Sequence, residues 1–106
     1  MEWLRHFLNV FQMKKWSGSV YQIFYTKTAQ KDILKLKAAH LDGKVKGLIE
    51  IIRQNPWQIP PSYEKLVGDL QGSYSRRINL QHRLIYQVYE EERIIKIISL
   101  WSHYER

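Results

Sequence analysis

The sequence contains no cysteine, and it also lacks an apolar run of transmembrane length and internal repeats. Without cysteine the chain has neither a disulfide framework nor a thiolate zinc site, which fits a reducing cytosol and favours a cytoplasmic location. No apolar run reaches the length of a transmembrane helix. Internal repeats and low-complexity segments are also missing. What is present is the composition of one globular domain: 106 residues, 44% of them hydrophobic and 13% aromatic.

Most signatures of catalytic sites are missing as well. No histidine pair has the spacing of a helical metal site, and neither a glycine-rich phosphate loop nor a Ser-His-Asp order is visible, so no metal or cofactor is expected. His40 ends a predicted helix and His82 begins a predicted strand, positions that favour structural roles. His103 near the C-terminus and Glu64 in a proline-bounded loop are left as the candidates for chemistry.

The charge balance is strongly basic, with 17 Lys and Arg against 10 Asp and Glu, a net charge of +7. A small basic domain predicts an anionic partner. The lysines between residues 27 and 46 have the pattern of an ordinary exposed helix face. Arg76, Arg77 and Arg83 instead lie in predicted strands with Tyr74 and other aromatic residues around them. Guanidinium groups match phosphate oxygens and aromatic rings stack on bases, so this stretch predicts an RNA surface, although composition alone would place most of these aromatics in the core.

Hydrophobic periodicity predicts two helices and at least four strands. Thr28 is the expected N-cap of the first helix, and Asp42 is expected to cap the second, which Asn55 and Pro56 end. The short connections between the later strands favour antiparallel hairpins. The expected elements are a strand at 20–26, helices within 27–40 and 42–55, a loop at 56–73, and strands at 74–80, 82–90 and 93–101.

These elements predict an α+β fold with two N-terminal helices packed on a twisted, mainly antiparallel sheet of four to five strands. The domain is expected to span residues 19–106. Residues 1–18 are expected to be an N-terminal extension, either a short amphipathic helix or sequence upstream of an internal start at Met13. A signal peptide is not expected, because Arg5 and His6 interrupt the apolar stretch.

Two segments make the chain recognisable: "PSYEKLVGDLQGSYSRRINLQHRLIYQVYEEE" and, near the end, "LWSHYE". With them the chain resembles the Txe/YoeB family of bacterial toxins, within the RelE/ParE superfamily, from about Val20 to Glu105. The resemblance implies a RelE/YoeB-like fold and a ribosome-dependent endoribonuclease that cuts messenger RNA in the A site and inhibits translation. As partners it implies the 70S ribosome and its messenger RNA, a cognate antitoxin of the YefM/Phd type, and a second copy in a homodimer.

The same resemblance assigns roles to individual residues. It implies Glu64, Arg83, His103 and Tyr104 as catalytic residues and a phosphate contact from Arg77, with Lys65 as a further candidate. Arg76 and Tyr74 are RNA-contact candidates from the arginine and aromatic pattern described above. We expect Glu64 to act as the base and His103 as the acid in attack by the RNA's own 2′-hydroxyl, which needs no metal. Leu100 and Trp101 are expected to anchor the strand that carries His103.

At one position the chain departs from the family pattern. A lysine three residues after the catalytic glutamate in YoeB is replaced here by Val67, and Lys65 is the candidate substitute. Two alternatives to a nuclease stay open: a ParE-like poison of DNA gyrase, and a module that binds RNA or the ribosome without catalysis. The first has no need for an acid-base pair, and the second would use the arginines only for affinity.

Overall fold

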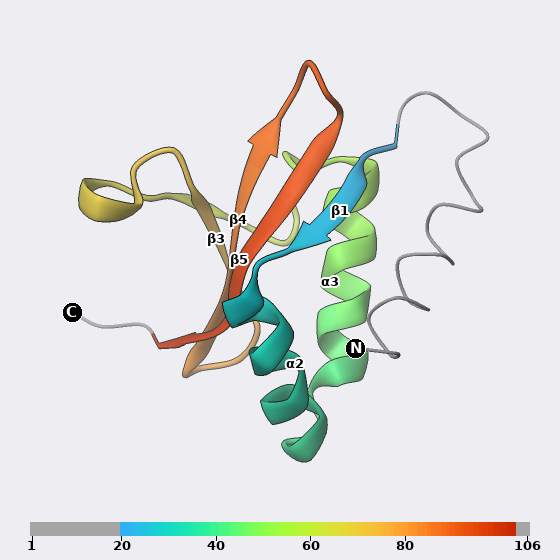
Figure 1. The fold of residues 1–106 in the computed structure, drawn as a ribbon, viewed down its shortest axis with the longest axis vertical. Coiled ribbons are helices and arrows are strands. Elements are labelled where there is room, and N and C mark those ends of the chain that lie inside the picture. The colour runs from blue at the N-terminus through green and yellow to red at the C-terminus, as the bar shows by residue number, and fades with distance from the viewer. Residues whose placement is uncertain (1–19, 104–106) are drawn as a thin grey trace.

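The computed structural model describes residues 20–103, in which a five-stranded sheet carries two α-helices on one face (Figure 1). The order of strands in the sheet is β1-β5-β4-β3-β2. β1 and β5 are parallel, and all other neighbours are antiparallel, so the predicted fold class is confirmed. The elements are β1 (Gln22–Tyr25), α2 (Lys27–Ala38), α3 (Asp42–Gln54), β2 (Glu64–Lys65), a 3-10 turn η1 (Gly68–Leu70), β3 (Tyr74–Arg77), β4 (His82–Tyr89) and β5 (Ile94–His103).

The core lies between the helices and the sheet. Both helices are amphipathic, and their apolar stripes meet the inward-facing residues of β1, β4 and β5 in one continuous cluster. Alternation along the strands directs the exposed Phe24 and its partner Lys96 to the face that α2 and α3 do not cover, while their neighbours Ile23, Ile95 and Ile97 point into the core. The buried hydrophobic residues of this cluster are Tyr21, Ile23, Ala29, Ile33, Leu36, Val45, Leu48, Ile49, Ile52, Ile78, Leu84, Tyr86, Ile95, Ile97 and Leu100.

Both predicted helix caps are wrong by one or two residues. Thr26, not Thr28, caps α2: its Oγ1 accepts a hydrogen bond from the amide of Ala29 at 3.0 Å. The hydroxyl of Thr26 also donates to the carbonyl of Ile98 in β5 at 2.6 Å, a contact across the fold that sequence alone does not reveal. Asp42 is the first residue of α3, and Leu41 holds the N-cap position without a side-chain hydrogen bond.

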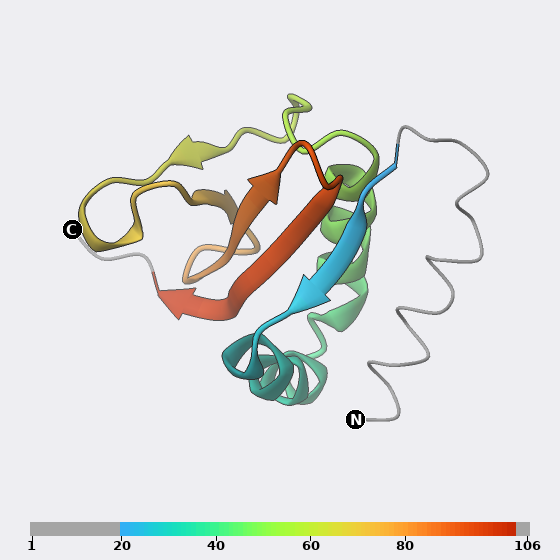
Figure 2. The ribbon, with the colours of Figure 1, turned by 45° about the horizontal axis from the view of Figure 1, so that its top comes forward.

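The segment predicted as a loop, residues 56–73, contains the short strand β2 and the 3-10 turn η1. β2 pairs with β3 through two residue pairs, Glu64 with Ser75 and Lys65 with Tyr74. Figure 2 shows β2 and η1 at the edge of the sheet farthest from β1 and the helices. The pairing of β2 makes Glu64 part of the sheet, whereas the sequence predicts it on a loop.

The end of β5 is tied to helix α2. The pairing of β4 with β5 shifts register twice, between Arg83 and Ile85 and between Ile85 and Tyr86. Near these irregularities the buried Asp32 of α2 accepts hydrogen bonds from the amides of Leu100 at 2.9 Å and Trp101 at 3.2 Å. A carboxylate therefore satisfies two backbone donors, which fixes the path of the strand toward His103.

Two of the predictions fall outside the residues that the structure describes: the N-terminal extension and the catalytic role of Tyr104. Neither helix within residues 20–103 has the length and apolar character that a membrane span requires.

Candidate active site

The candidate site forms where three strands place polar side chains on the open face of the sheet, the face that the helices leave uncovered. Ser75 pairs with Glu64 on one side, and Arg77 pairs with Arg83 on the other. Directly paired residues share a face, and along β3 the side chains alternate between faces. Ser75 and Arg77 therefore project from the open face together with Glu64 and Arg83.

These side chains line a pocket of about 260 Å³. Within it a nitrogen of the Arg83 guanidinium, Nη1, lies 3.5 Å from Oε1 of Glu64 and donates to Oγ of Ser75 at 2.9 Å. The Arg83 side chain is only 8% exposed, whereas that of Glu64 is 56% exposed. The guanidinium is thus held in place, while the carboxylate can be reached from outside. The pocket is lined by Pro61, Ser62, Tyr63, Glu64, Ser75, Arg77 and Arg83.

The pocket carries more positive than negative charge. Arg77 is exposed, and among residues 20–103 no carboxylate lies within ion-pair distance of it. Two guanidinium groups therefore face one carboxylate, a balance that favours an anion such as a phosphate. In the described part of the chain, no three His, Asp or Glu side chains come together as a metal site would require.

Arg76 and Tyr74, both expected to contact RNA, lie on the other face of β3. Arg76 is completely buried, and its guanidinium donates to the hydroxyl of Tyr86 and to the carbonyls of Pro56 and Pro61. This position contradicts the prediction that Arg76 contacts RNA. Tyr74 is half-buried and packs edge-on against Trp57, with ring centroids 4.9 Å apart, so it belongs to an aromatic cluster under the sheet.

The structure also locates the two residues that bear on the missing family lysine. Val67 is 82% exposed and follows β2 outside the pocket. Lys65 is exposed but pairs with Tyr74, so alternation directs its side chain to the face opposite Glu64. The structure therefore does not bring Lys65 to the pocket lining.

His103 is the last residue of β5, and its backbone pairs with that of His82, next to Arg83. The end of β5 thus runs beside the strand that carries Arg83. His82 itself is buried and stacks on Trp101, with ring centroids 3.8 Å apart, which agrees with a structural role. Leu100 is fully buried and Trp101 packs against the core, so the expected anchoring of this strand end is seen.

Sequence reasoning missed four residues of the pocket lining: Ser75 on β3, and Pro61, Ser62 and Tyr63 before β2. Ser75 could have been found from the two-residue period of "YSRR", which puts it on the same face as Arg77. Tyr63 carries no such signal, because it lies before β2 in a segment whose path depends on contacts across the fold.

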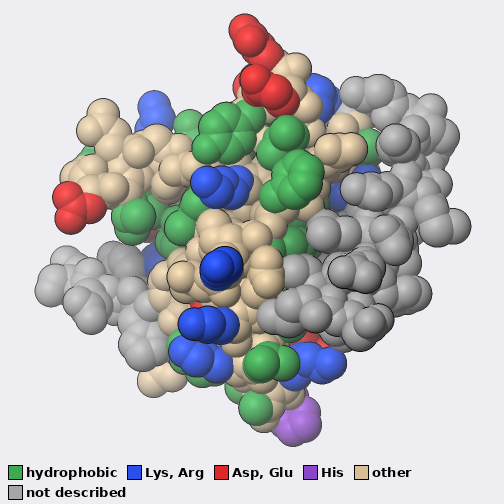
Figure 3. Space-filling model, in the orientation of Figure 1, with side chains coloured by type: hydrophobic (Ala, Val, Ile, Leu, Met, Phe, Trp, Pro, Cys, Tyr) green, Lys and Arg blue, Asp and Glu red, His purple; other side chains and the backbone are tan. Residues whose placement is uncertain are grey.

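The predicted lysine surface lies on α2, away from the pocket. Figure 3 shows lysine and arginine side chains gathered over this helix, where Lys27, Lys31, Lys35 and Lys37 are all exposed. The exposed positions match the polar face of an amphipathic helix, as the sequence predicts.

Comparison with known proteins identifies the family. Residues 22–104 match the model of the YoeB-like toxin of bacterial type II toxin-antitoxin systems. Toxin YoeB of Synechocystis sp. is 38% identical over 63 residues, which cover 59% of this chain and 71% of that protein.

Solved structures agree with this match. A YoeB/ParE toxin from Agrobacterium tumefaciens superimposes with a TM-score of 0.70 at 27% identity, covering 77% of this chain and 98% of that one. The toxin of a heterotetrameric YoeB-YefM toxin-antitoxin complex from Staphylococcus aureus gives a TM-score of 0.67 at 33% identity, covering 79% and 98%. The chain belongs to the YoeB-like toxin family of bacterial type II toxin-antitoxin systems.

Proposed function

We propose that this toxin is a ribosome-dependent endoribonuclease that cleaves messenger RNA in the ribosomal A site and thereby inhibits translation. The observation that supports it most is the meeting of an exposed carboxylate, Glu64, with a buried guanidinium, Arg83, 3.5 Å apart in a pocket that also contains Arg77. This combination offers a proton acceptor and an anion site side by side.

In the proposed reaction the RNA supplies the nucleophile. Glu64 takes the proton from a 2′-hydroxyl, and the oxygen attacks the adjacent phosphorus in line. Because the Glu64 carboxylate is more than half exposed, a bound strand can reach it. A positioned base of this kind contributes roughly a hundred- to ten-thousand-fold to the rate.

Arg83 and Arg77 stabilise the negative charge that grows on the phosphorane. Arg83 is oriented in advance by its bond to Ser75, so little reorganisation accompanies the reaction. Donors fixed in this way stabilise the transition state more than mobile donors do, because no free energy is needed to reorient them during the reaction.

His103 donates a proton to the departing 5′ oxygen, leaving a 2′,3′-cyclic phosphate on the upstream fragment. The family motif carries this assignment, and in the structure the backbone of His103 ends β5, paired with that of His82. Tyr104 stacks on a base or binds the phosphate. The pocket is small and open, and we infer that the ribosome orients the RNA over it.

We further propose that an antitoxin of the YefM type neutralises this toxin. The similarity to the toxin in a YoeB-YefM complex supports this partner class. Co-expression with the neighbouring gene should restore growth, and a complex should be recovered by purification.

Mapping of cleavage tests the proposed activity. Purified toxin is added to ribosomes loaded with a defined messenger RNA, and the fragments are mapped by primer extension. We expect cuts at the A-site codon that occur only when the ribosome is present. The variants Glu64→Ala and His103→Ala should not produce them. Salt-dependent binding of RNA without cuts would indicate the non-catalytic module, and inhibition of DNA supercoiling would indicate a gyrase poison.

A further inference from the structure

Arg76 has an unusual position for a cation. It is completely buried, and all three of its nitrogens donate hydrogen bonds: Nε to the Tyr86 hydroxyl at 3.1 Å, Nη2 to the carbonyl of Pro56 at 2.9 Å, and Nη1 to the carbonyl of Pro61. One side chain thus forms hydrogen bonds with both ends of the segment 56–61. A guanidinium suits this task because its donors form a rigid planar fork.

Aromatic rings enclose the same guanidinium. Its central carbon lies 5.0 Å from the ring centroid of Tyr63 and 5.9 Å from that of Tyr86. In the part of the chain that the structure describes, no carboxylate lies within ion-pair distance of Arg76. Carbonyl dipoles and ring faces therefore compensate the buried charge.

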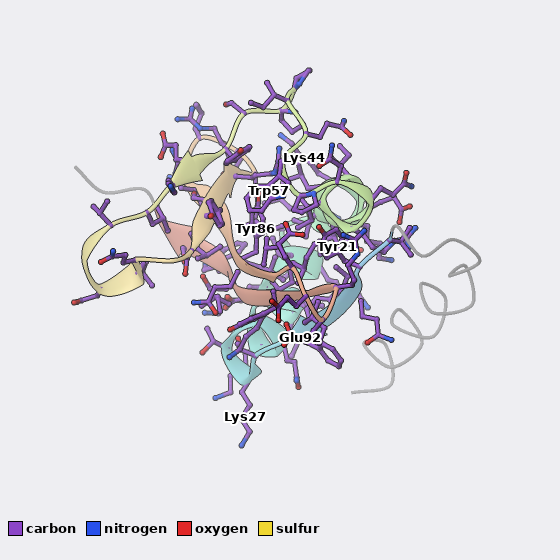
Figure 4. All side chains as sticks on the ribbon, turned by 90° about the horizontal axis from the view of Figure 1, so that it is seen from above. Tyr21, Lys27, Lys44, Trp57, Tyr86 and Glu92 are labelled. Carbon is purple, nitrogen blue, oxygen red and sulfur yellow. The ribbon has the colours of Figure 1, made fainter. Side chains whose placement is uncertain are left out.

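Tyr86 supports the same segment. Its hydroxyl donates to the carbonyl of Pro56 at 2.9 Å while accepting from Arg76. Burial raises the pKa of Tyr86, against the opposing effect of Arg76, so the hydroxyl keeps its proton. Figure 4 shows Tyr86 and Trp57 close together beside α3, and Trp57 contacts both Tyr63 and Tyr74.

The segment that Arg76 holds leads directly into Glu64. Tyr63 precedes Glu64, and Pro61 lies three positions before it. On its other side, within the described residues, the backbone at Glu64 is held by the two pairs of β2 and by the bond from the Leu66 amide to the Ser73 carbonyl at 2.9 Å, while the carboxylate itself meets Arg83 at 3.5 Å. So short a strand fixes its residues weakly by itself. The contacts of Arg76 are therefore a major restraint on where the Glu64 carboxylate lies.

We propose that Arg76 is a positioning residue, whose guanidinium clamps residues 56–63 and so holds Glu64 beside Arg83. The inference rests on the proposed function where it concerns cleavage, but the clamp itself can be tested without it. Arg77, the next residue along β3, provides a matched control, because it lies on the opposite face of the same strand and, within residues 20–103, makes none of the hydrogen bonds by which Arg76 holds Pro56 and Pro61.

Hydrogen exchange tests the clamp independently of activity. In Arg76→Lys, the amides of residues 57–66 should exchange faster by roughly tenfold or more, while those of α3 and β5 keep their protection. Arg77→Lys should leave both regions as in the unaltered protein. Unchanged protection of residues 57–66 in Arg76→Lys would overturn the clamp.

A double-mutant cycle tests the action through Glu64. Arg76→Lys should lower the single-turnover cleavage rate at saturating ribosome by roughly ten- to a hundredfold, with little change in the half-saturating concentration, because a misplaced group affects the chemical step. Combined with Glu64→Gln, it should cause no further loss. Losses that multiply would contradict the positioning role.

Two further outcomes separate this inference from the proposed function. If Glu64→Gln cleaved normally, the proposed role of Glu64 would fail, and hydrogen exchange would still decide the clamp. Should Arg76→Lys not fold, Tyr86→Phe retains the guanidinium and ring but removes one bond to Arg76 and one to Pro56. It should produce the same exchange pattern to a smaller degree, roughly threefold, and no change in exchange would count against the clamp.

Discussion

On one face of β3, Arg76 is buried under residues 56–63 and donates to backbone carbonyls, whereas on the other face Arg77 opens onto a pocket with Glu64 and Arg83. The two arginines are adjacent and chemically identical, yet one is bonded within the protein and the other is available to a ligand. What separates them is the two-residue period of the strand, since the side chains point to opposite faces. The role of an arginine in this fold therefore depends on which face its strand position selects.

The two faces also differ in how they can tolerate change. The polar groups under the sheet are buried, so removing one leaves its partners without hydrogen bonds. On the open face Glu64 and Arg77 are exposed, so their removal changes the charge of the pocket at little cost to the fold. The comparison predicts that substitutions on the open face affect cleavage, and that those under the sheet affect stability as well.

The largest effect is expected for Glu64→Gln, which keeps the size of the side chain but removes the proton acceptor. Cleavage of ribosome-bound messenger RNA should fall by roughly a hundred- to ten-thousand-fold. The free energy of unfolding should change by no more than about 0.5 kcal/mol, because the pair with Arg83 is partly exposed. Single-turnover kinetics and chemical denaturation measure the two quantities. A large decrease in the free energy of unfolding, together with the loss of cleavage, would contradict the distinction between the two faces.

Arg83→Ala should follow, with cleavage reduced by roughly a hundred- to a thousandfold because the pre-oriented donor to the phosphorane is lost. Ser75→Ala serves as its control, since it removes the hydroxyl that orients Arg83 and leaves the charge in place. Primer extension on a time course gives both rates. Equal rates for Arg83→Ala and the unaltered toxin would show that this guanidinium takes no part in the reaction.

A stability difference is expected between the two adjacent arginines. Arg76→Met should lower the free energy of unfolding by about 3 kcal/mol, because the carbonyls of Pro56 and Pro61 lose charged donors in a buried site. Arg77→Met should lower it by less than about 0.5 kcal/mol. Urea denaturation followed by tryptophan fluorescence compares them. Similar values for the two variants would contradict the assignment of faces.

The smallest effect is expected for Lys65→Ala. Its side chain projects away from Glu64, and it does not line the pocket. Cleavage should remain within roughly twofold of the unaltered rate, because a surface substitution outside the site seldom matters. A reduction of tenfold or more would instead assign Lys65 the contact that Val67 cannot make.

Much of the fold follows from periodicity in the sequence. The stripe of Ile33 and Leu36 and that of Val45 and Ile49 predict the two helices, and the β-branched runs predict β1, β4 and β5. β2 could not be predicted, because two residues carry no period and pair only when β3 is alongside. The cap at Thr26 was missed for a similar reason, since its second bond reaches Ile98.

In the site, as in the fold, local sequence patterns predict some residues correctly, whereas positions set by contacts between distant segments are not predicted. The family motifs predict Glu64, Arg77 and Arg83 as site residues, and the structure brings them to one pocket. The prediction that Arg76 contacts RNA is wrong, because Arg76 pairs with Leu84 and is completely buried on the core face of β3. Its bonds to Pro56 and Pro61 depend on the path of a segment that has no periodicity.

The chemical ends of the cleavage products test most directly whether the open face carries a ribonuclease that uses the RNA's own hydroxyl. The fragments from ribosome-bound messenger RNA are separated and their termini are determined by mass spectrometry. Attack by the 2′-hydroxyl predicts an upstream fragment ending in a 2′,3′-cyclic phosphate and a downstream fragment with a free 5′-hydroxyl. An upstream 3′-hydroxyl with a downstream 5′-phosphate would contradict this chemistry, because it requires attack by water.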